Sequence, residues 1–172
     1  NTSKKIKDLF FVKTDINSQK SLEALIGKSV NKFGKIDALI NCSFPKNSNY
    51  GKKILDVDYK DFTENIKLHL GGYFLTTQLF TKYFLEKGGG RVINFASIYG
   101  TINPKFEIYN KTNIVNSIEY ASIKSGIVQM NKFFAKLFTK KNIKFNTISP
   151  GGIINNHSKK FISNYKKYSG SK

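Results

Sequence analysis

Several residue types are scarce in this chain of 172 residues, and each scarcity excludes a class of protein. The one cysteine, Cys42, excludes an internal disulfide and indicates a reducing compartment, so we expect a cytoplasmic location. The two histidines, His69 and His157, lie far from each other and from the cysteine in sequence, so no metal site is expected. No run of about 18 apolar residues occurs, and the first residues lack the apolar segment of a signal peptide. We therefore expect no membrane partner.

Arginine is also scarce, because Arg91 is the only one and scattered lysines carry nearly all of the net charge of +18. Arginine is the residue that makes bidentate contacts with bases and phosphates. No nucleic-acid partner is therefore expected. A lysine-rich RNA-binding module remains an alternative, supported only by FFAKLFTKK and FISNYKK, which also fit amphipathic helices.

The residues that are present indicate one packed α/β domain. Hydrophobic residues make up 40% of the chain, which is enough for a core. Short apolar segments predict strands in DLFFVKTD, KIDALIN, RVINFAS and IKFNTIS. Helical periodicity lies between them, from about Ser18 to Gly34, from about Tyr59 to Leu85, and around Tyr120. This alternation predicts a doubly wound, Rossmann-like parallel sheet covered on both faces.

One element of a dinucleotide-binding domain is missing from the sequence. Such a domain begins with a strand, a glycine-rich turn and a helix, whereas the glycines of EKGGGRV precede a strand and cannot hold a pyrophosphate at a helix N-terminus. Either the chain is a fragment or it binds no dinucleotide. We expect residues 1–172 to form a single partial domain, incomplete at both ends. A truncated binding module without catalytic activity is therefore the main alternative to an enzyme.

Tyr120 and Lys124 are the candidate catalytic pair. Their spacing alone is weak evidence, since two other Tyr-x-x-x-Lys pairs occur, but only Tyr120 lies near the start of a helix that follows a strand and a loop. Residues four apart share a helix face, and an ammonium beside a phenol lowers the phenol pKa from about 10 toward neutrality. Such a phenol can exchange a proton with a carbonyl or an alcohol, while the Ser97 hydroxyl can bond the same oxygen.

Five stretches, in order along the chain, resemble motifs of the short-chain dehydrogenase/reductase family. They are VKTDIN, LINCSF, RVINFAS, YASIK and ISPGGI. The resemblance implies that Tyr120 is the general acid/base, that Ser97 positions the substrate carbonyl, and that Lys124 binds the nicotinamide ribose of NAD or NADP. The cofactor-binding residues that it implies are Asp15, Ile16, Asn41, Cys42, Ser43, Tyr120, Lys124, Pro150, Gly151, Ile153 and Asn155. The substrate-binding residues are Ser97, Tyr99 and Tyr120.

The chain departs from the family pattern at several positions. His69 stands where the family has a helix asparagine, and it either takes over a proton relay or is a packed structural histidine. Phe44 replaces a turn glycine, and Asn155 replaces a threonine that contacts the carboxamide. The loop between Ser97 and Tyr120 is about ten residues longer than usual, and such loops often determine substrate choice.

The substrate and the assembly follow from the same resemblance. LHLGGYFLTTQ and SIYGTINPKFEIY are similar to a subgroup found with bacterial surface-sugar pathways, which make nonulosonic acids or modify flagellin. We therefore expect a small sugar or sugar-like substrate. The aromatic-rich stretch YFLTTQLFTKYF exceeds what one sheet face requires, and the corresponding helix builds a dimer interface in the family, so we expect a homodimer or homotetramer.

Overall fold

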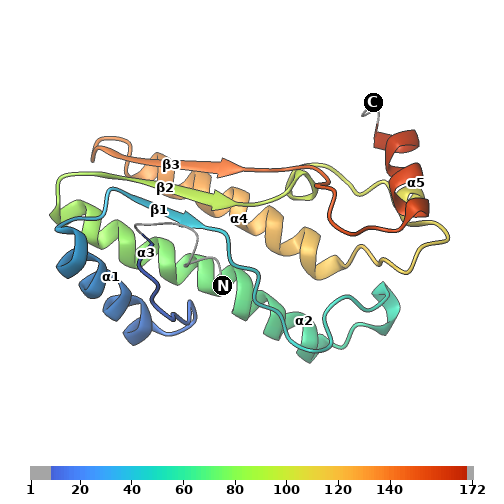
Figure 1. Ribbon diagram of the computed structural model, residues 1–172, viewed down its shortest axis with the longest axis horizontal. Coiled ribbons are helices and arrows are strands. Elements are labelled where there is room, and N and C mark those ends of the chain that lie inside the picture. The colour runs from blue at the N-terminus through green and yellow to red at the C-terminus, as the bar shows by residue number, and fades with distance from the viewer. Residues whose placement is uncertain (1–8, 170–172) are drawn as a thin grey trace.

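A parallel sheet of three strands, in the order β1–β2–β3, is the centre of the fold in this computed structural model, which describes residues 9–169 (Figure 1). The strands are β1 (Ala38–Asn41), β2 (Gly90–Phe95) and β3 (Ile143–Ile148). Asn41 is in register with Asn94, and Asn94 with Thr147, so the carboxyl ends of the strands meet at one edge. The predicted parallel, Rossmann-like sheet is confirmed.

The helices begin and end where the sequence carries capping signals. In α1 (Gln19–Phe33), the Ser18 side chain accepts a hydrogen bond from Ser21 N, and Gly34 ends the helix with a φ of 80°. The other helices are α2 (Tyr59–Ile66), α3 (Gly72–Glu86), α4 (Ile118–Leu137) and α5 (Lys159–Ser169). Short 3-10 turns lie at η2 (Ile54–Asp56), η4 (Ile98–Gly100) and η5 (Phe106–Tyr109). The predicted helix from Ser18 to Gly34 is therefore confirmed.

The helix predicted from Tyr59 to Leu85 is continuous but not uniform. A π-helical turn, η3 (Lys67–Gly71), joins α2 to α3 and contains His69. Helical periodicity alone does not reveal such a turn, because only one extra residue enters the helix. Directly after it, a Cβ added to Gly72 would lie 2.6 Å from Ile16 Cδ1, so the chain before α1 packs closely on the start of α3.

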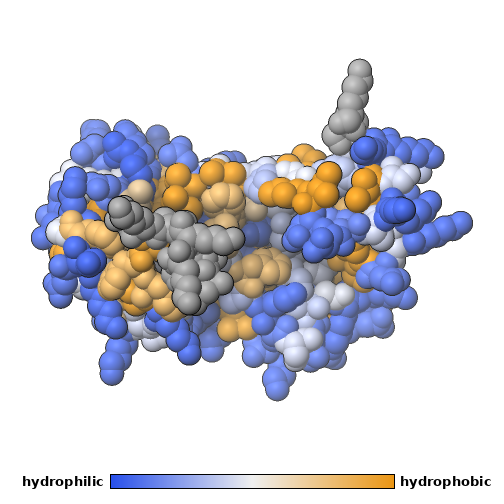
Figure 2. All heavy atoms as spheres, viewed as in Figure 1, coloured by the Kyte–Doolittle hydropathy of each residue, from blue (hydrophilic) through white to orange (hydrophobic). Residues whose placement is uncertain are grey.

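Helices cover one face of the sheet within residues 9–169, whereas the sequence pattern predicts cover on both. Figure 1 shows α1, α3 and α4 on the same side of the strands. The core on that side consists of Leu39, Phe80, Tyr83, Phe84, Val92, Phe134, Ile143 and Phe145. Successive strand residues point to opposite faces, so Ile40 and Ile148 point away from these helices and are 60% and 42% exposed. Figure 2 shows apolar patches between areas of hydrophilic residues at the surface.

The strand predicted in DLFFVKTD is wrong for its described part. Residues 9–15 form no strand, and Asp8 lies outside the described residues. A strand needs ladder hydrogen bonds to a neighbour, and within the described part of the chain β1 pairs only with β2. Instead, the Phe10 ring packs edge-on against Phe33 at the end of α1, with the ring centroids 5.9 Å apart. These apolar residues are only partly covered, and Phe11 is 75% exposed.

The C-terminal helix packs on the long loop between β2 and α4. Phe161 and Asn164 of α5 are buried, and Asn164 Nδ2 donates hydrogen bonds to the carbonyls of Ile108 and Asn110. FISNYKK lies inside this helix, which confirms its interpretation as an amphipathic helix. Across residues 9–169, no helix has both the length and the apolarity needed to cross a bilayer.

Candidate active site

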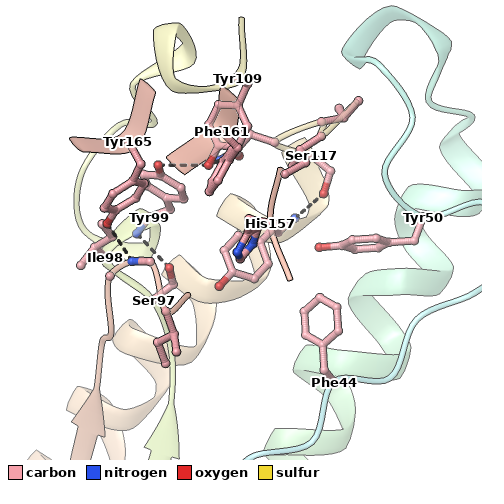
Figure 3. A pocket seen from close by; sticks show the side chains of 17 residues that line it. Phe44, Tyr50, Ser97, Ile98, Tyr99, Tyr109, Ser117, His157, Phe161 and Tyr165 are labelled. Atoms are coloured by element: carbon pink, nitrogen blue, oxygen red, sulfur yellow. Dashed lines mark hydrogen bonds between the residues drawn. The ribbon is translucent and has the colours of Figure 1, made fainter. Parts of the chain in front are cut away.

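The carboxyl edge of the sheet borders a cavity of about 330 Å³. Segments that are distant in sequence meet around it, and the cavity is lined among others by Phe44, Tyr50, Ser97, Tyr99, Tyr120 and Tyr165 (Figure 3). Ser97 follows β2 and is 4% exposed, and its Oγ atom accepts a hydrogen bond from Tyr99 N at 3.2 Å. This position agrees with the rule that ligands of parallel α/β sheets bind beyond the carboxyl ends of the strands.

The first turn of α4 places Tyr120 at the cavity. Ser117 caps the helix, because its Oγ atom accepts a hydrogen bond from Tyr120 N at 3.3 Å. One turn later, Lys124 Nζ lies 5.6 Å from the centroid of the Tyr120 ring and donates to Phe95 O at 2.9 Å. The structure therefore brings both residues close to the end of β2, where Ser97 also lies.

Lys124 is 4% exposed, which changes its acid–base behaviour. Burial lowers the pKa of Lys124 to about 8, and the charge of Cys42 opposes this shift. A fraction of the amine is therefore neutral near physiological pH.

Gly100 controls how closely the segment after Ser97 approaches α4. A Cβ atom at this position would lie 2.7 Å from Lys124 O and 3.2 Å from Ser125 N. Because these are backbone atoms, they cannot rotate away. The glycine thus allows η4 and α4 to be in contact, and the contact holds the candidate catalytic residues together.

Phe44, which stands in place of the family's glycine, is central to the aromatic side of the site. Its ring lies 5.0 Å from the His69 ring and 6.0 Å from the Tyr120 ring, both edge-on, and 5.8 Å from Lys124 Nζ. These centroid distances are typical of favourable aromatic and cation–π contacts. Sequence comparison with the family motif indicated a changed loop, whereas the structure shows a side chain that touches three candidate catalytic residues.

His69 has the packing expected of a structural histidine, and a role in a proton relay stays a prediction. It is 1% exposed and packed between Phe44 and Tyr73, as a structural histidine is. Burial first, and the charge of Lys124 second, lower its pKa to about 3, so its imidazole is neutral at physiological pH. Its Nε2 atom has no hydrogen-bond partner, and it is therefore available to donate or accept a hydrogen bond.

Asn41 is held by a chain of buried amides under the strand ends. Its Nδ2 atom donates to Asn94 Oδ1 at 2.9 Å, and Asn94 Nδ2 donates to Asn131 Oδ1 at 2.8 Å. The Tyr73 hydroxyl lies 3.0 Å from the Asn41 carbonyl and 3.1 Å from the Ser43 carbonyl, and these two acceptors share its one proton. These bonds fix the turn after β1. Asn94 is visible in the sequence as a polar residue inside an apolar strand, but the partners of its amide are not.

The other predicted cofactor residues lie in three places. Cys42 is exposed, and the buried Ser43 Oγ atom has no hydrogen-bond partner. After β3, Pro150 O accepts from Ile98 N at 3.1 Å, and Gly152 N, beside Gly151, donates to the Tyr165 hydroxyl at 2.8 Å. Further on, Ile153 is 71% exposed and Asn155 N donates to His157 Nδ1.

Asp15 and Ile16 lie beside the start of α3 and do not line the cavity. Asp15 Oδ1 accepts a hydrogen bond from Asn17 N at 2.8 Å, and Ile16 packs on the buried cluster that contains Tyr73 and Ala96. These two residues are therefore separate from the group around Tyr120.

The long loop before α4 contributes a chain of hydroxyl groups. Asn116 Nδ2 donates to the Tyr109 hydroxyl at 2.9 Å, which donates to the Tyr99 hydroxyl at 3.1 Å. Burial, and then the neighbouring Tyr109, raise the pKa of Tyr99. Of these three hydrogen-bonded residues, only Tyr99 was among the predicted substrate residues. Within residues 9–169 no three His, Cys, Asp or Glu side chains form a group that could hold a metal ion.

Known proteins with similar sequences identify the family. The sequence profile described as short chain dehydrogenase matches residues 1–166. This chain belongs to the short-chain dehydrogenase family. It is 38% identical over 167 residues to the post-translational flagellin modification protein A of Campylobacter coli, covering 96% of this chain and 65% of that protein. It is also 30% identical over 156 residues to the 7alpha-hydroxysteroid dehydrogenase of Bacteroides fragilis, covering 90% of this chain and 54% of that protein.

Solved structures of the short-chain dehydrogenase family show the same fold. A short chain dehydrogenase from Leptospira borgpetersenii, crystallised with NAD+, matches with a TM-score of 0.78 and 32% identity, over 94% of this chain and 61% of that one. This chain thus spans less than two thirds of the length of these relatives. The family predicted from five short motifs is confirmed.

Proposed function

We propose that this protein interconverts an alcohol and a carbonyl with NAD or NADP as the cofactor. The observation that carries the proposal is the position of Lys124, buried against the Tyr120 ring at the end of β2. It is supported by family membership and by the NAD+ bound to the Leptospira borgpetersenii relative. In this assignment, the candidate catalytic residues are Ser97, Tyr120, Lys124 and His69.

The residues of the site fit the nicotinamide half of such a cofactor. The ammonium of Lys124 has three donor positions, and Phe95 O takes one of them, which leaves donors for ribose hydroxyls. The unpartnered Ser43 Oγ atom and the segment from Pro150 to Asn155 supply further polar groups. When bound, the nicotinamide supplies or accepts the hydride.

The remaining roles belong to the side chains of this chain. Tyr120 donates a proton to the substrate oxygen during reduction and takes it back during oxidation, and Ser97 hydrogen-bonds the same oxygen as negative charge develops. Lys124, with its lowered pKa, can return a proton to Tyr120. Neutral His69, with its free Nε2 atom, can hold the next hydrogen-bonding group in a proton path.

The proposed substrate is a small sugar-like molecule in the cytoplasm. The hydroxyl chain from Asn116 through Tyr109 to Tyr99 supports this proposal, because such groups match the hydroxyls of a sugar. The similarity to a flagellin modification protein supports it as well.

A homo-oligomer is proposed because aromatic residues are exposed on α3 and α4. The high aromatic content of α3 alone no longer supports it. Most aromatic residues of α3, including Tyr73, Phe80 and Phe84, are buried inside the chain and need no partner. The exposed aromatic residues of these helices are Phe74 on α3, at 45%, and Phe133 on α4, at 64%. These two helices therefore keep a smaller apolar surface than their composition predicted.

Titration with NADH tests the proposal. We expect NADH to raise the melting temperature and to accept energy transfer from the tyrosines. Oxidised cofactor with a panel of simple sugars should give absorbance at the wavelength of the reduced cofactor, and Tyr120→Phe should abolish this turnover while NADH still binds. Absence of NADH binding would favour the alternative, a binding module without catalysis, since no glycine-rich turn of the pyrophosphate-binding type occurs in the described residues.

A further inference from the structure

The wall of the cavity opposite Ser97 is built by the loop after β1. Figure 3 shows Phe44 and Tyr50 on this side, facing Tyr99 and Tyr165 across the cavity, with the Tyr50 hydroxyl directed inward. The Tyr50 hydroxyl is buried and has no hydrogen-bond partner. Buried hydroxyl groups nearly always have a partner, so an unpaired one that faces a cavity indicates a place for a ligand atom.

This loop is fixed rather than free to collapse onto the cavity. Asn47 N donates to Asn65 Oδ1 at 2.9 Å, and Asn65 Nδ2 donates back to Asn47 Oδ1 at 3.1 Å. Asn47 Nδ2 also donates to Asp61 Oδ1 at 3.1 Å, and Lys52 Nζ pairs with Asp61 at 2.8 Å. Asn65 and Asp61 belong to α2 and are almost fully buried. The position of Tyr50 is therefore preorganised, which reduces the entropy lost when a ligand binds.

The Tyr50 hydroxyl interacts with Ser117, the residue before α4. Burial raises the pKa of Tyr50 to about 12, the Ser117 hydroxyl opposes this shift, and the charges of Glu119 and Tyr120 add to it. Tyr50 is therefore a neutral phenol at physiological pH.

We infer that Tyr50 is a substrate-binding residue whose hydroxyl hydrogen-bonds a hydroxyl or ammonium group of the substrate. A neutral phenol has lone pairs that accept such a bond. This inference rests on the proposed function and deepens it. It assigns the substrate to polyhydroxylated or amino-substituted rings, and it disfavours steroids and acyl chains, which leave such polar groups unpaired.

One single-atom substitution tests the inference by binding, without turnover. Tyr50→Phe removes one oxygen and keeps the ring against Phe44. Tyr59→Phe on α2 is the matched control, because Tyr59 is 83% exposed and does not line the cavity. The probes are methyl glucoside, its 2-amino analogue and cholate, measured by calorimetry and by saturation-transfer NMR.

We expect Tyr50→Phe to weaken both sugar probes about tenfold, the effect of one buried hydrogen bond. Cholate binding should be the same in all variants. Equal sugar binding in Tyr50→Phe and the unmodified protein, absence of any sugar binding, or tighter binding of cholate than of both sugars would overturn the inference.

The two proposals fail in different ways. If sugars bind with these dependences but never reduce the cofactor, the proposed function fails and the role of Tyr50 stands. If sugars are oxidised and Tyr50→Phe has the same kcat/KM, the function stands and the inference fails.

Discussion

Lys124 Nζ lies 5.6 Å from the centroid of the Tyr120 ring while it donates a hydrogen bond to Phe95 O, the last carbonyl of β2. One side chain thus connects α4, the sheet and the candidate acid. Because the amine is almost fully buried, its ionisation is coupled to the folding of the protein.

Replacing Lys124 should change how stability depends on pH. The folded pKa of about 8 lies below the ordinary value of 10.5, so the unfolded chain binds more protons between these values and stability rises with pH across that window. One such group contributes up to about 1.4 kcal/mol per pH unit. Urea unfolding at several pH values above 8 should show a smaller rise in Lys124→Met than in the unmodified protein. Identical slopes would contradict the lowered pKa.

His69 should affect stability on the acid side. Its pKa of about 3 in the folded protein lies below 6.5, so protonation of the unfolded chain removes stability as the pH falls below 6.5. We expect His69→Asn, which carries the family's residue, to lose less stability between neutral pH and mild acid. In the unmodified protein, the pH profile of turnover should contain no transition that is due to His69. The profile should therefore be the same after this substitution. Such a transition near neutrality would show that the imidazole titrates in the folded protein.

Two glycine substitutions should have opposite effects. Gly100→Ala places a Cβ atom 2.7 Å from Lys124 O, so we expect a loss of about 1–3 kcal/mol in the free energy of unfolding, as for an overpacked core. Turnover should fall as well, since η4 and α4 carry Ser97 and Tyr120. Gly27→Ala in α1 is the control, because nothing lies within 4 Å of its Cβ position, and alanine favours a helix by about 0.5–1 kcal/mol. Thermal unfolding measures both, and equal melting temperatures would argue against the close contact.

Association through α3 and α4 should depend on their exposed aromatic residues. Phe133 is 64% exposed, and the Phe74 ring lies 6.4 Å from the ring of Phe134, the next residue along α4. We expect Phe133→Lys to shift the protein to a monomer in sedimentation velocity at micromolar concentration. Phe106→Lys, at a residue 63% exposed on η5, should leave the oligomer intact. A monomer in the unmodified protein would reject the proposal.

The elements that the sequence predicted well are those with a strong local signal. Tyr120 and Lys124 could be placed because helical spacing and a capping serine fix their face of α4. The strand expected before Asp15 was wrong, because an apolar segment pairs only where a neighbouring strand offers its edge. Composition alone therefore could not distinguish packing on α1 from pairing in the sheet.

Contacts between distant segments could not be read from the sequence. The position of Tyr50 at the cavity depends on how the loop after β1 is held on α2, and no local pattern encodes that placement. The buried amide chain from Asn41 to Asn131 also forms only when β1, β2 and α4 are assembled. Long-range hydrogen bonds of this kind are properties of the whole topology.

The π turn at Lys67–Gly71 determines the rotational phase of the helix on either side of it. One inserted residue turns all that follows by about 100° about the helix axis. This offset lets Asp61 and Asn65 point toward the loop after β1 while Phe80 and Phe84 point into the core. A helix of uniform pitch through the same sequence could direct only one of these two sets of side chains correctly, either the set that faces the loop or the set that faces the core.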